Sequence, residues 1–367
     1  MKKFLTLVSL IALTVIQFAC SSSDSPVAPV VVDPPVVVSD DFIRAADISY
    51  LPEIESAGAV FTNNGKTEDM LTTLKNSGCN TIRIRLWKNP ANGHSGLAEV
   101  KTLAARVKQA GLKVWLTVHY SDTWADPGVQ TTPDEWKNLS FADLKTAVAA
   151  YTSTIITEIN PDIIQIGNEI NDGFLWPQGK LSTNETQCID LLKTASAVIR
   201  SKAPNTKIMI HYAGVNASDT DWFFGKVKTV DYDYIGLSYY PIWHGKDLTV
   251  VKSTIDALGT KFSKKVIIAE TAYPFTLDWN DKTNNIMGQE NQLVSGYPAT
   301  PEGQKNYMLA IKNLVKTSKS GIGFAYWGGE WIAFKGTAST NGSTFENQAF
   351  YDFSNKALPV LQAFSLN

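Results

Sequence analysis

Short apolar runs alternate with longer amphipathic segments along this 367-residue chain, and this alternation limits the folds that it can adopt. The apolar runs have the length of strands, and the segments between them carry apolar residues at the spacings of a helix. Such alternation predicts βαβ units around a parallel sheet. We expect eight strands, at residues 45–49, 80–86, 113–119, 162–168, 207–211, 233–238, 265–270 and 321–327. We expect helices at residues 67–76, 97–109, 141–159, 185–202, 250–258 and 301–317, and a closing helix near 357–364.

Two α/β folds share this alternation, a closed barrel and an open doubly wound sheet. The doubly wound fold should place a glycine-rich phosphate-binding turn after its first strand. Here the first strand is followed by Tyr50-Leu51-Pro52-Glu53, which cannot cradle a phosphate in that way. Hydrophobic residues make up 44% of the chain, which is enough to fill one large core. The sequence therefore predicts an α/β fold of the (β/α)8 TIM-barrel type, as one domain over residues 42–367.

The first 41 residues differ in composition from the predicted barrel. Lys2 and Lys3 precede an apolar stretch at residues 4–19, which describes an export signal and is too short for a membrane span. Cys20 follows this stretch as in a bacterial lipoprotein cleavage site, although residues 17 and 18 depart from the strict motif. An ordinary signal peptide cut nearby is the alternative. We expect a lipoprotein signal peptide at 1–19, a lipid-anchored flexible linker at 20–41, and an exported protein held at the outer membrane or cell surface.

The remaining cysteines and the net charge exclude several classes of function. Cys79 opens a predicted strand and Cys188 lies in a helical segment, so we expect two unpaired buried thiols. The sequence has no CxxC motif and no Cys/His cluster that would predict a zinc site. The formal charge of −2 argues against nucleic acid as a partner.

Polar side chains gather where the predicted strands end, and in a (β/α)8 barrel that rim is where active sites are built. Glu169 and Glu270 each close an apolar run. Cleavage of a glycosidic bond requires two carboxyl groups close together, and two glutamates on one rim can provide them. Arg83 and Arg85 are predicted to point into the barrel mouth, where they need carboxylates to neutralise them. Either arginine could instead belong to a structural ion-pair layer below the site. The same rim should present Asp47, Arg83, Arg85, His119, Asn168, His211, Tyr239, Tyr240 and Trp327.

Longer motifs along the chain carry a family resemblance. They are Asp47-Ile48-Ser49-Tyr50-Leu51-Pro52, Arg83-Ile84-Arg85-Leu86-Trp87-Lys88-Asn89-Pro90, His119-Tyr120-Ser121-Asp122-Thr123-Trp124-Ala125-Asp126-Pro127-Gly128, Gln165-Ile166-Gly167-Asn168-Glu169 and Ser238-Tyr239-Tyr240-Pro241-Ile242-Trp243-His244-Gly245. In these motifs the chain resembles the endo-β-1,4-galactanases of glycoside hydrolase family 53. The likeness covers nearly all of residues 43–335, in order and at the expected spacing.

The resemblance implies a retaining glycosidase with one catalytic domain and no cofactor for catalysis. Glu169 would be the acid/base and Glu270 the nucleophile, with their carboxyl groups roughly 5–5.5 Å apart. Glu270, beside Arg83 or Arg85, should stay ionised. The nearby charge of Glu270 should then raise the pKa of Glu169.

Further roles follow from the same resemblance. Asn168 would bind the sugar 2-hydroxyl. Either Tyr239 or Tyr240 would donate to the nucleophile, and the residue nearest the strand, Tyr239, is favoured. His119 could bind sugar hydroxyls or support Glu169, while a role for His211 stays open.

Tryptophans on or just after the strand ends could stack on the C–H faces of sugar rings. Core packing is the alternative for each one taken alone. We expect Trp327 to form the floor of the central subsite, and His244 to join the substrate-binding set through its motif. The tryptophans are Trp87, Trp124, Trp243, Trp327 and Trp331.

A long polar loop follows Glu270, and the resemblance implies a structural Ca²⁺ in it. Its candidate ligands are Asp278, Asn280 and Asp281, since oxygen ligands at close spacing suit calcium. The spacing is not that of an EF-hand, and a solvated loop is the alternative.

The sequence thus predicts an endo-acting, retaining galactanase that cuts β-1,4-galactosidic bonds in galactan or type I arabinogalactan. Its partners would be this polysaccharide and, through the lipid anchor, a membrane, and we expect a monomer. A retaining enzyme for another β-linked glycan, such as mannan or glucan, is one alternative. A surface lipoprotein that binds glycans without cleaving them is another, but it would have no need of both Glu169 and Glu270.

Overall fold

The computed structural model describes residues 41–366 of the chain. The predictions for the signal peptide, for nearly all of the linker and for Cys20 lie outside these residues.

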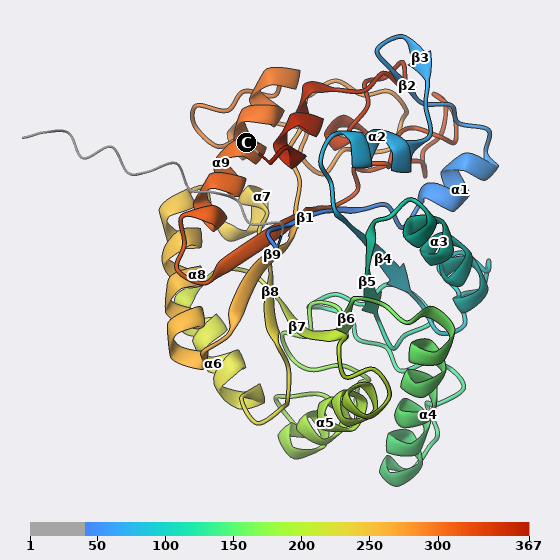
Figure 1. The fold of residues 1–367 in the computed structure, drawn as a ribbon, viewed down its shortest axis with the longest axis vertical. Helices are drawn as coiled ribbons and strands as arrows, with labels where there is room; N and C mark the ends of the chain where they lie inside the picture. The colour runs from blue at the N-terminus through green and yellow to red at the C-terminus, as the bar shows by residue number, and fades with distance from the viewer. Residues whose placement is uncertain (1–40, 367) are drawn as a thin grey trace, which may run out of the picture. The chain divides into compact units, whose positions relative to one another are not determined.

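Eight parallel strands close into a barrel, as predicted. Each strand pairs with its neighbours in chain order, and the first pairs with the last (Figure 1). The strand register brings functional positions together, because Asp47 lies opposite Arg83, and Ser238 lies opposite Glu270. The strands are β1 (Ile43–Asp47), β4 (Thr81–Leu86), β5 (Lys113–Val118), β6 (Ile163–Ile166), β7 (Lys207–Ala213), β8 (Tyr234–Ser238), β9 (Lys265–Thr271) and β10 (Gly321–Tyr326).

Helices cover the outside of the barrel between successive strands (Figure 1). They are α1 (Leu51–Ser56), α2 (Met70–Asn76), α3 (Leu97–Gln109), α4 (Phe141–Ile159), α5 (Glu185–Lys202), α6 (Ala217–Val227), α7 (Pro241–His244), α8 (Leu248–Phe262) and α9 (Pro301–Lys316). Short 3-10 turns are η1 (Glu290–Gln292), η2 (Glu346–Gln348) and η3 (Pro359–Phe364). In the part of the chain that the structure describes, no helix is long and apolar enough to cross a membrane.

Two predicted helix positions need correction. Residues 66–67 pair with residues 62–63 as a small hairpin, β2 (Thr62–Asn63) and β3 (Lys66–Thr67), so the helix predicted from residue 67 begins at Met70. Asp69 caps it by accepting from the backbone N–H of Thr72. The closing segment is a 3-10 turn rather than an α-helix. Helices α1, α6 and α7 were not predicted.

Two apolar layers build the core. The larger one fills the space between strands and helices and includes the buried thiols Cys79 and Cys188, which are unpaired as expected. The smaller one fills the inside of the barrel with alternate strand residues. Its members are Ile43, Ala45, Trp115, Ile163, Met209, Ile267, Ala269 and Ala325. The Arg83 guanidinium lies over the Trp115 ring, 5.6 Å from its centroid, so this layer supports the site above it.

Candidate active site

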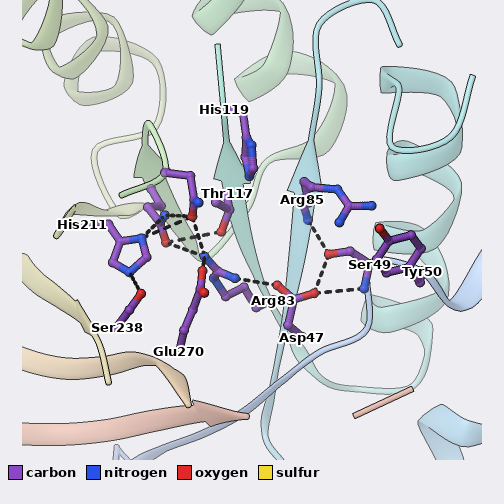
Figure 2. Close-up of polar contacts among 12 residues, drawn as sticks. Asp47, Ser49, Tyr50, Arg83, Arg85, Thr117, His119, His211, Ser238 and Glu270 are labelled. Atoms are coloured by element: carbon purple, nitrogen blue, oxygen red, sulfur yellow. Dashed lines mark hydrogen bonds and ion pairs between the residues drawn. The ribbon is translucent and has the colours of Figure 1, made fainter. Parts of the chain in front are cut away.

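Arg83 lies at the centre of the candidate site. Its Nη1 donates to Asp47 Oδ2 at 2.7 Å, and its Nη2 donates to Glu270 Oε1 at 2.6 Å. Nη2 also donates to Asn168 Oδ1 at 3.0 Å. Figure 2 shows the guanidinium between Asp47 and Glu270. Both carboxylates are buried, so this single cation neutralises part of a buried acidic pair and fixes the position of Glu270.

Glu270 has a second donor, and it is not the predicted one. Tyr240 Oη donates to Glu270 Oε2 at 3.1 Å, whereas Tyr239 Oη donates to the carbonyl of Gly245 at 2.8 Å. The preference for Tyr239 is therefore wrong. Alternate side chains of a strand point to the same side. Gly236 faces Met209 inside the barrel, so Ser238 and the extended Tyr240 face inward after it.

Glu169 follows β6 in a backbone conformation that is rare for its residue type. Its φ is 48°, in the left-handed region, and the preceding Gly167 has φ 78°. The side chain accepts from Ser238 Oγ through Oε1 at 2.5 Å. One carboxylate oxygen of Glu169 lies within 4.8 Å of one of Glu270. Buried Gln130 donates to the backbone carbonyls of Asn168 and Glu169, which fixes this turn.

The surroundings of the two glutamates differ in charge. Burial, and secondarily the negative charge of Glu270, raise the pKa of Glu169 to about 8. The increase was predicted, but burial contributes more to it than the neighbouring charge. Burial also raises the pKa of Glu270, and the Arg83 charge and the Tyr240 hydroxyl act in the opposite direction. Glu270 accepts from a cation, whereas Glu169 accepts from a neutral hydroxyl. Near neutral pH we therefore expect Glu169 to be protonated and Glu270 to be ionised.

A cavity of about 170 Å³ opens above these carboxylates. Most of the residues predicted for the site line it. They are Asp47, Arg83, Arg85, His119, Trp124, Asn168, Glu169, Tyr240, Trp243, Glu270 and Trp327, together with Ala125, Asp126 and Phe345. Trp243 is 56% exposed and lies at the edge of the polar centre, where a platform for a further sugar ring would be accessible.

Three predicted residues lie behind the cavity wall instead. Trp87 is buried, and its Nε1 donates to His119 Nδ1 at 3.2 Å. His244 Nδ1 accepts from the backbone N–H of Tyr240 at 3.0 Å. Tyr239 is fully buried. These three side chains therefore support cavity residues and do not face a substrate directly.

The contacts of His119 define its tautomer. Its Nδ1 accepts from Trp87 Nε1 and from the backbone N–H of Ala125, both at 3.2 Å. Burial and the charges of Arg85 and Arg83 hold the pKa of His119 well below its usual range. A neutral ring whose Nδ1 accepts must carry its proton on Nε2. His119 is thus a hydrogen-bond donor at the cavity.

Arg85 is a buried cation enclosed by aromatic rings. The rings of Tyr50, Trp87 and Trp124 lie 4.5, 4.4 and 4.2 Å from its guanidinium carbon. Ser95 Oγ accepts from Nε and Nη2 of the same arginine. Among residues 41–366 no carboxylate pairs with Arg85, and cation–π contact stabilises such a cation. Arg85 consequently holds Trp124 in the cavity wall.

Sequence reasoning missed two polar residues that touch the site from behind. Ser238 contacts Glu169, and Gln165 donates to His211 Nδ1 at 2.9 Å. Both lie inside motifs that carry the family resemblance, so strand parity could have identified them. It also missed Glu330, a buried glutamate after β10 that accepts from the backbone N–H of Tyr50 at 2.8 Å. No nearby sequence pattern marks Glu330.

The acids of the loop after β9 are engaged by the protein itself. Asp281 Oδ1 accepts from the backbone N–H of Thr283, and Oδ2 accepts from that of Ser343. Asp278 is exposed and accepts from Thr276. Across residues 41–366, the one group of three His, Cys, Asp or Glu side chains close enough to share an ion is Glu169, His211 and Glu270. Calcium at the loop therefore stays a prediction.

A closed (β/α)8 barrel with two close carboxylates at its strand ends defines the class of barrel glycoside hydrolases. The model of glycosyl hydrolase family 53 matches residues 43–364, and the chain belongs to this family.

Relatives and solved structures agree with this assignment. An arabinogalactan endo-β-1,4-galactanase of Cellvibrio japonicus is 34% identical, over 88% of this chain and 90% of its own length. An endo-β-1,4-galactanase of Bacillus subtilis is 31% identical, over 89% of this chain and 86% of its own. The family 53 catalytic domain of Ignisphaera aggregans superposes with a TM-score of 0.85 and 37% identity, covering 92% of this chain and 98% of that one.

Proposed function

We propose that this protein is an endo-acting β-1,4-galactanase that cleaves galactan by retaining double displacement. Family membership and the galactanases among its relatives support the substrate. The spacing of Glu169 and Glu270 supports the mechanism, because oxygens within 4.8 Å of each other leave no room for the water of an inverting site. This spacing carries the mechanistic part of the proposal.

In the first step the ionised Glu270 attacks the anomeric carbon while Glu169 gives its proton to the departing glycosidic oxygen. The bond from carbon to that oxygen breaks, and a galactosyl ester forms on Glu270. Arg83 and Tyr240 hold the attacking carboxylate in place and ionised. The raised pKa of Glu169, about 8, keeps its proton available at neutral pH.

In the second step water attacks the same carbon, and Glu169 accepts the water proton. Glu270 leaves as a carboxylate, so the product keeps the β configuration. Esterification has removed the Glu270 charge, which lowers the pKa of Glu169 and favours its role as a base. Because burial is the larger cause of the raised pKa, this decrease is partial.

Hydrogen-bonding and aromatic groups of the cavity suit a sugar ring. Asn168 accepts from Arg83, and its Nδ2 donates to the carbonyl of Ala125, so its amide is held at the mouth of the nucleophile site for a 2-hydroxyl. His119 offers a hydrogen-bond donor, while Trp124, Trp327 and Trp243 offer flat faces on which the sugar rings of the polysaccharide can stack.

Two experiments test the assignment. Release of reducing ends should be at least tenfold faster on β-1,4-galactan than on mannan or β-glucan; comparable rates would favour the alternative substrates. The roles of the two glutamates are separable with azide and an activated aryl β-galactobioside. Glu169→Ala should yield the β-galactosyl azide, and Glu270→Ala the α-azide, because azide replaces water in the first case and the nucleophile in the second. The reverse pattern would exchange the roles.

The N-terminal assignment is part of the proposal. A basic start, an apolar stretch and Cys20 support export and a lipid anchor at the outer membrane or cell surface. Cys20→Ala should release an active protein from the membrane fraction. Absence of labelled palmitate from the wild-type protein would contradict the anchor.

A structural Ca²⁺ and a monomeric state complete the proposal. For calcium, one supporting observation is the buried amide oxygen of Asn285, in the loop of Asp278, Asn280 and Asp281. It has no hydrogen-bond partner within the described part of the chain, residues 41–366. When bound, the ion would link oxygen ligands of this loop. Dialysis against EGTA should then lower the melting temperature, and Ca²⁺ but not Mg²⁺ should restore it. A single species of about 40 kDa in sedimentation would support the monomer.

A further inference from the structure

A chain of hydrogen bonds runs from the backbone of Glu169 through two side chains to the carboxyl group of the same residue. The backbone N–H of Glu169 donates to His211 Nδ1 at 3.3 Å. His211 Nε2 lies 2.9 Å from Ser238 Oγ, and Ser238 Oγ donates to Glu169 Oε1 at 2.5 Å. Figure 2 shows His211 and Ser238 in contact beside Glu270. His211 and Ser238 are both fully buried, so water does not compete for these bonds.

The contacts of His211 indicate the direction of each hydrogen bond in this series. Asn168 Oδ1, an acceptor, also lies 3.3 Å from Nδ1 of His211, but it already accepts from Arg83. The backbone N–H of Glu169 can only donate, so with two donors facing it Nδ1 is assigned as an acceptor. Gln165 Nε2 lies 2.9 Å from the same nitrogen and can also donate to it. A neutral ring whose Nδ1 accepts carries its proton on Nε2, and this N–H donates a hydrogen bond to Ser238 Oγ. The one hydrogen of Ser238 is therefore free to point only at Glu169.

The charged and titratable groups around His211 favour the neutral ring. Burial and the positive charge of Arg83, from β4, hold the pKa of His211 well below its usual range. His119, after β5, is the other histidine in its electrostatic surroundings. Glu169, after β6, and Glu270, on β9, lie within 4.8 Å of a ring nitrogen. Of these two, Glu270 is already paired with Arg83.

We propose that Ser238 and His211 are positioning residues that confine the catalytic proton of Glu169 to Oε2. Since Oε1 always accepts from Ser238, a proton on the carboxyl group must be on the other oxygen. Oε2 has no hydrogen-bond partner among residues 41–366, and Glu169 lines the cavity. In the second step the same bond keeps Oε1 occupied, so Oε2 is also the base. This inference rests on the proposed acid/base role of Glu169.

The test compares two substrates that differ in their need for a proton. Ser238→Ala should lower kcat/KM on galactan roughly 10- to 100-fold, because an imprecisely held acid loses part of the usual 10²–10⁴-fold benefit of general acid catalysis. On a dinitrophenyl β-galactobioside, whose leaving group departs without protonation, kcat/KM should stay within about twofold. The alkaline limb of the galactan pH profile should move to higher pH, because a hydrogen bond that favours the carboxylate is lost.

Control variants keep the test decisive. Ser238→Thr retains the hydroxyl and should restore most of the galactan activity. His211→Ala removes the donor that orients Ser238 and should show the same substrate dependence; it decides the question if Ser238→Ala does not fold. Equal loss on both substrates, or no loss and no shift of the alkaline limb, would overturn the inference. Glu169→Gln distinguishes failure of this inference from failure of the proposed function, since retained galactan activity in that variant would overturn the proposed function itself.

Discussion

At the scale of single residues, the site assigns opposite protonation states to two glutamates by giving them different donors. Glu270 accepts from the guanidinium of Arg83 and the hydroxyl of Tyr240. Glu169 accepts from the hydroxyl of Ser238. A charged donor stabilises a carboxylate more than a neutral one does, so the difference in donors separates the acid from the nucleophile.

Tyr240→Phe should weaken the nucleophile mainly on the acidic side of the pH profile. The Tyr240 hydroxyl lowers the pKa of Glu270 against the effect of burial, and its loss should raise that pKa further. Because the ionised form is active, the acidic limb of kcat/KM should move to higher pH, with a loss of about tenfold at the optimum. Tyr239→Phe is the matched control, since its hydroxyl donates to Gly245, and its profile should keep the wild-type limbs. A shift of equal size in both variants would contradict the assignment.

Residue-level prediction from sequence succeeded where a side chain lies at a strand end and failed where a contact joins distant segments. The carboxylate pair and Arg83 follow from strand positions alone. The choice of Tyr240 over Tyr239 needed the structure, which shows that Gly236 faces Met209 and thereby sets the parity of the residues after it. The contact of Glu330 with Tyr50 needed it too, because it joins residues 280 positions apart through the packing of the loop after β10.

At the scale of secondary-structure elements, helices with strong periodicity were predicted with correct bounds. Helices α3, α4 and α5 begin and end at the predicted residues. Helix α6 was missed although its buried residues, Thr220, Phe223, Phe224 and Val227, show helical spacing. The closing segment became a 3-10 turn because it starts at Pro359 and is only six residues long, too short to be stable as an isolated helix.

Asn216 is the signal that defines the start of α6, and its removal should destabilise the helix. Its side chain accepts from the backbone N–H groups of Ser218 and Asp219. Asn216→Ala should lower the free energy of unfolding by about 1 kcal/mol in urea denaturation, with galactan turnover unchanged. Asn216→Asp keeps the acceptor and should be close to wild type. If alanine and aspartate variants are equally stable, the cap contributes nothing.

At the scale of the whole molecule, the buried charges of the barrel mouth balance only if two acids stay neutral. Arg83 and Arg85 supply two positive charges, and Asp47 and Glu270 supply two negative ones. Burial, and then the charge of Asp47, raise the pKa of Glu330 to about 8. Burial raises that of Glu169 to about 8 as well. The mouth is therefore close to neutral below pH 8 and gains negative charge above it.

Glu330→Gln should reduce the loss of stability at alkaline pH. The pKa of Glu330 is higher in the folded chain than in the unfolded chain, so the folded chain binds more protons. The contribution of Glu330 to stability is therefore complete below about pH 4.5 and is lost as the pH rises through 8. Wild-type protein should lose stability between pH 6 and 9, and the variant should lose on the order of a few kcal/mol less. Urea denaturation at both pH values measures this difference. The exposed Glu290→Gln is the control, and an unchanged slope in Glu330→Gln would contradict the prediction.

The left-handed backbone of Glu169 has a consequence for how this barrel can change over generations. Glycine or asparagine would adopt a φ of 48° at lower cost, since left-handed geometry disfavours a long side chain by roughly 1–2 kcal/mol. The residue that performs the chemistry is thus one that the fold alone would not select. Relaxed selection on activity would favour its replacement, and the resulting barrel would gain thermal resistance as it lost turnover. At position 169 stability and activity therefore compete directly.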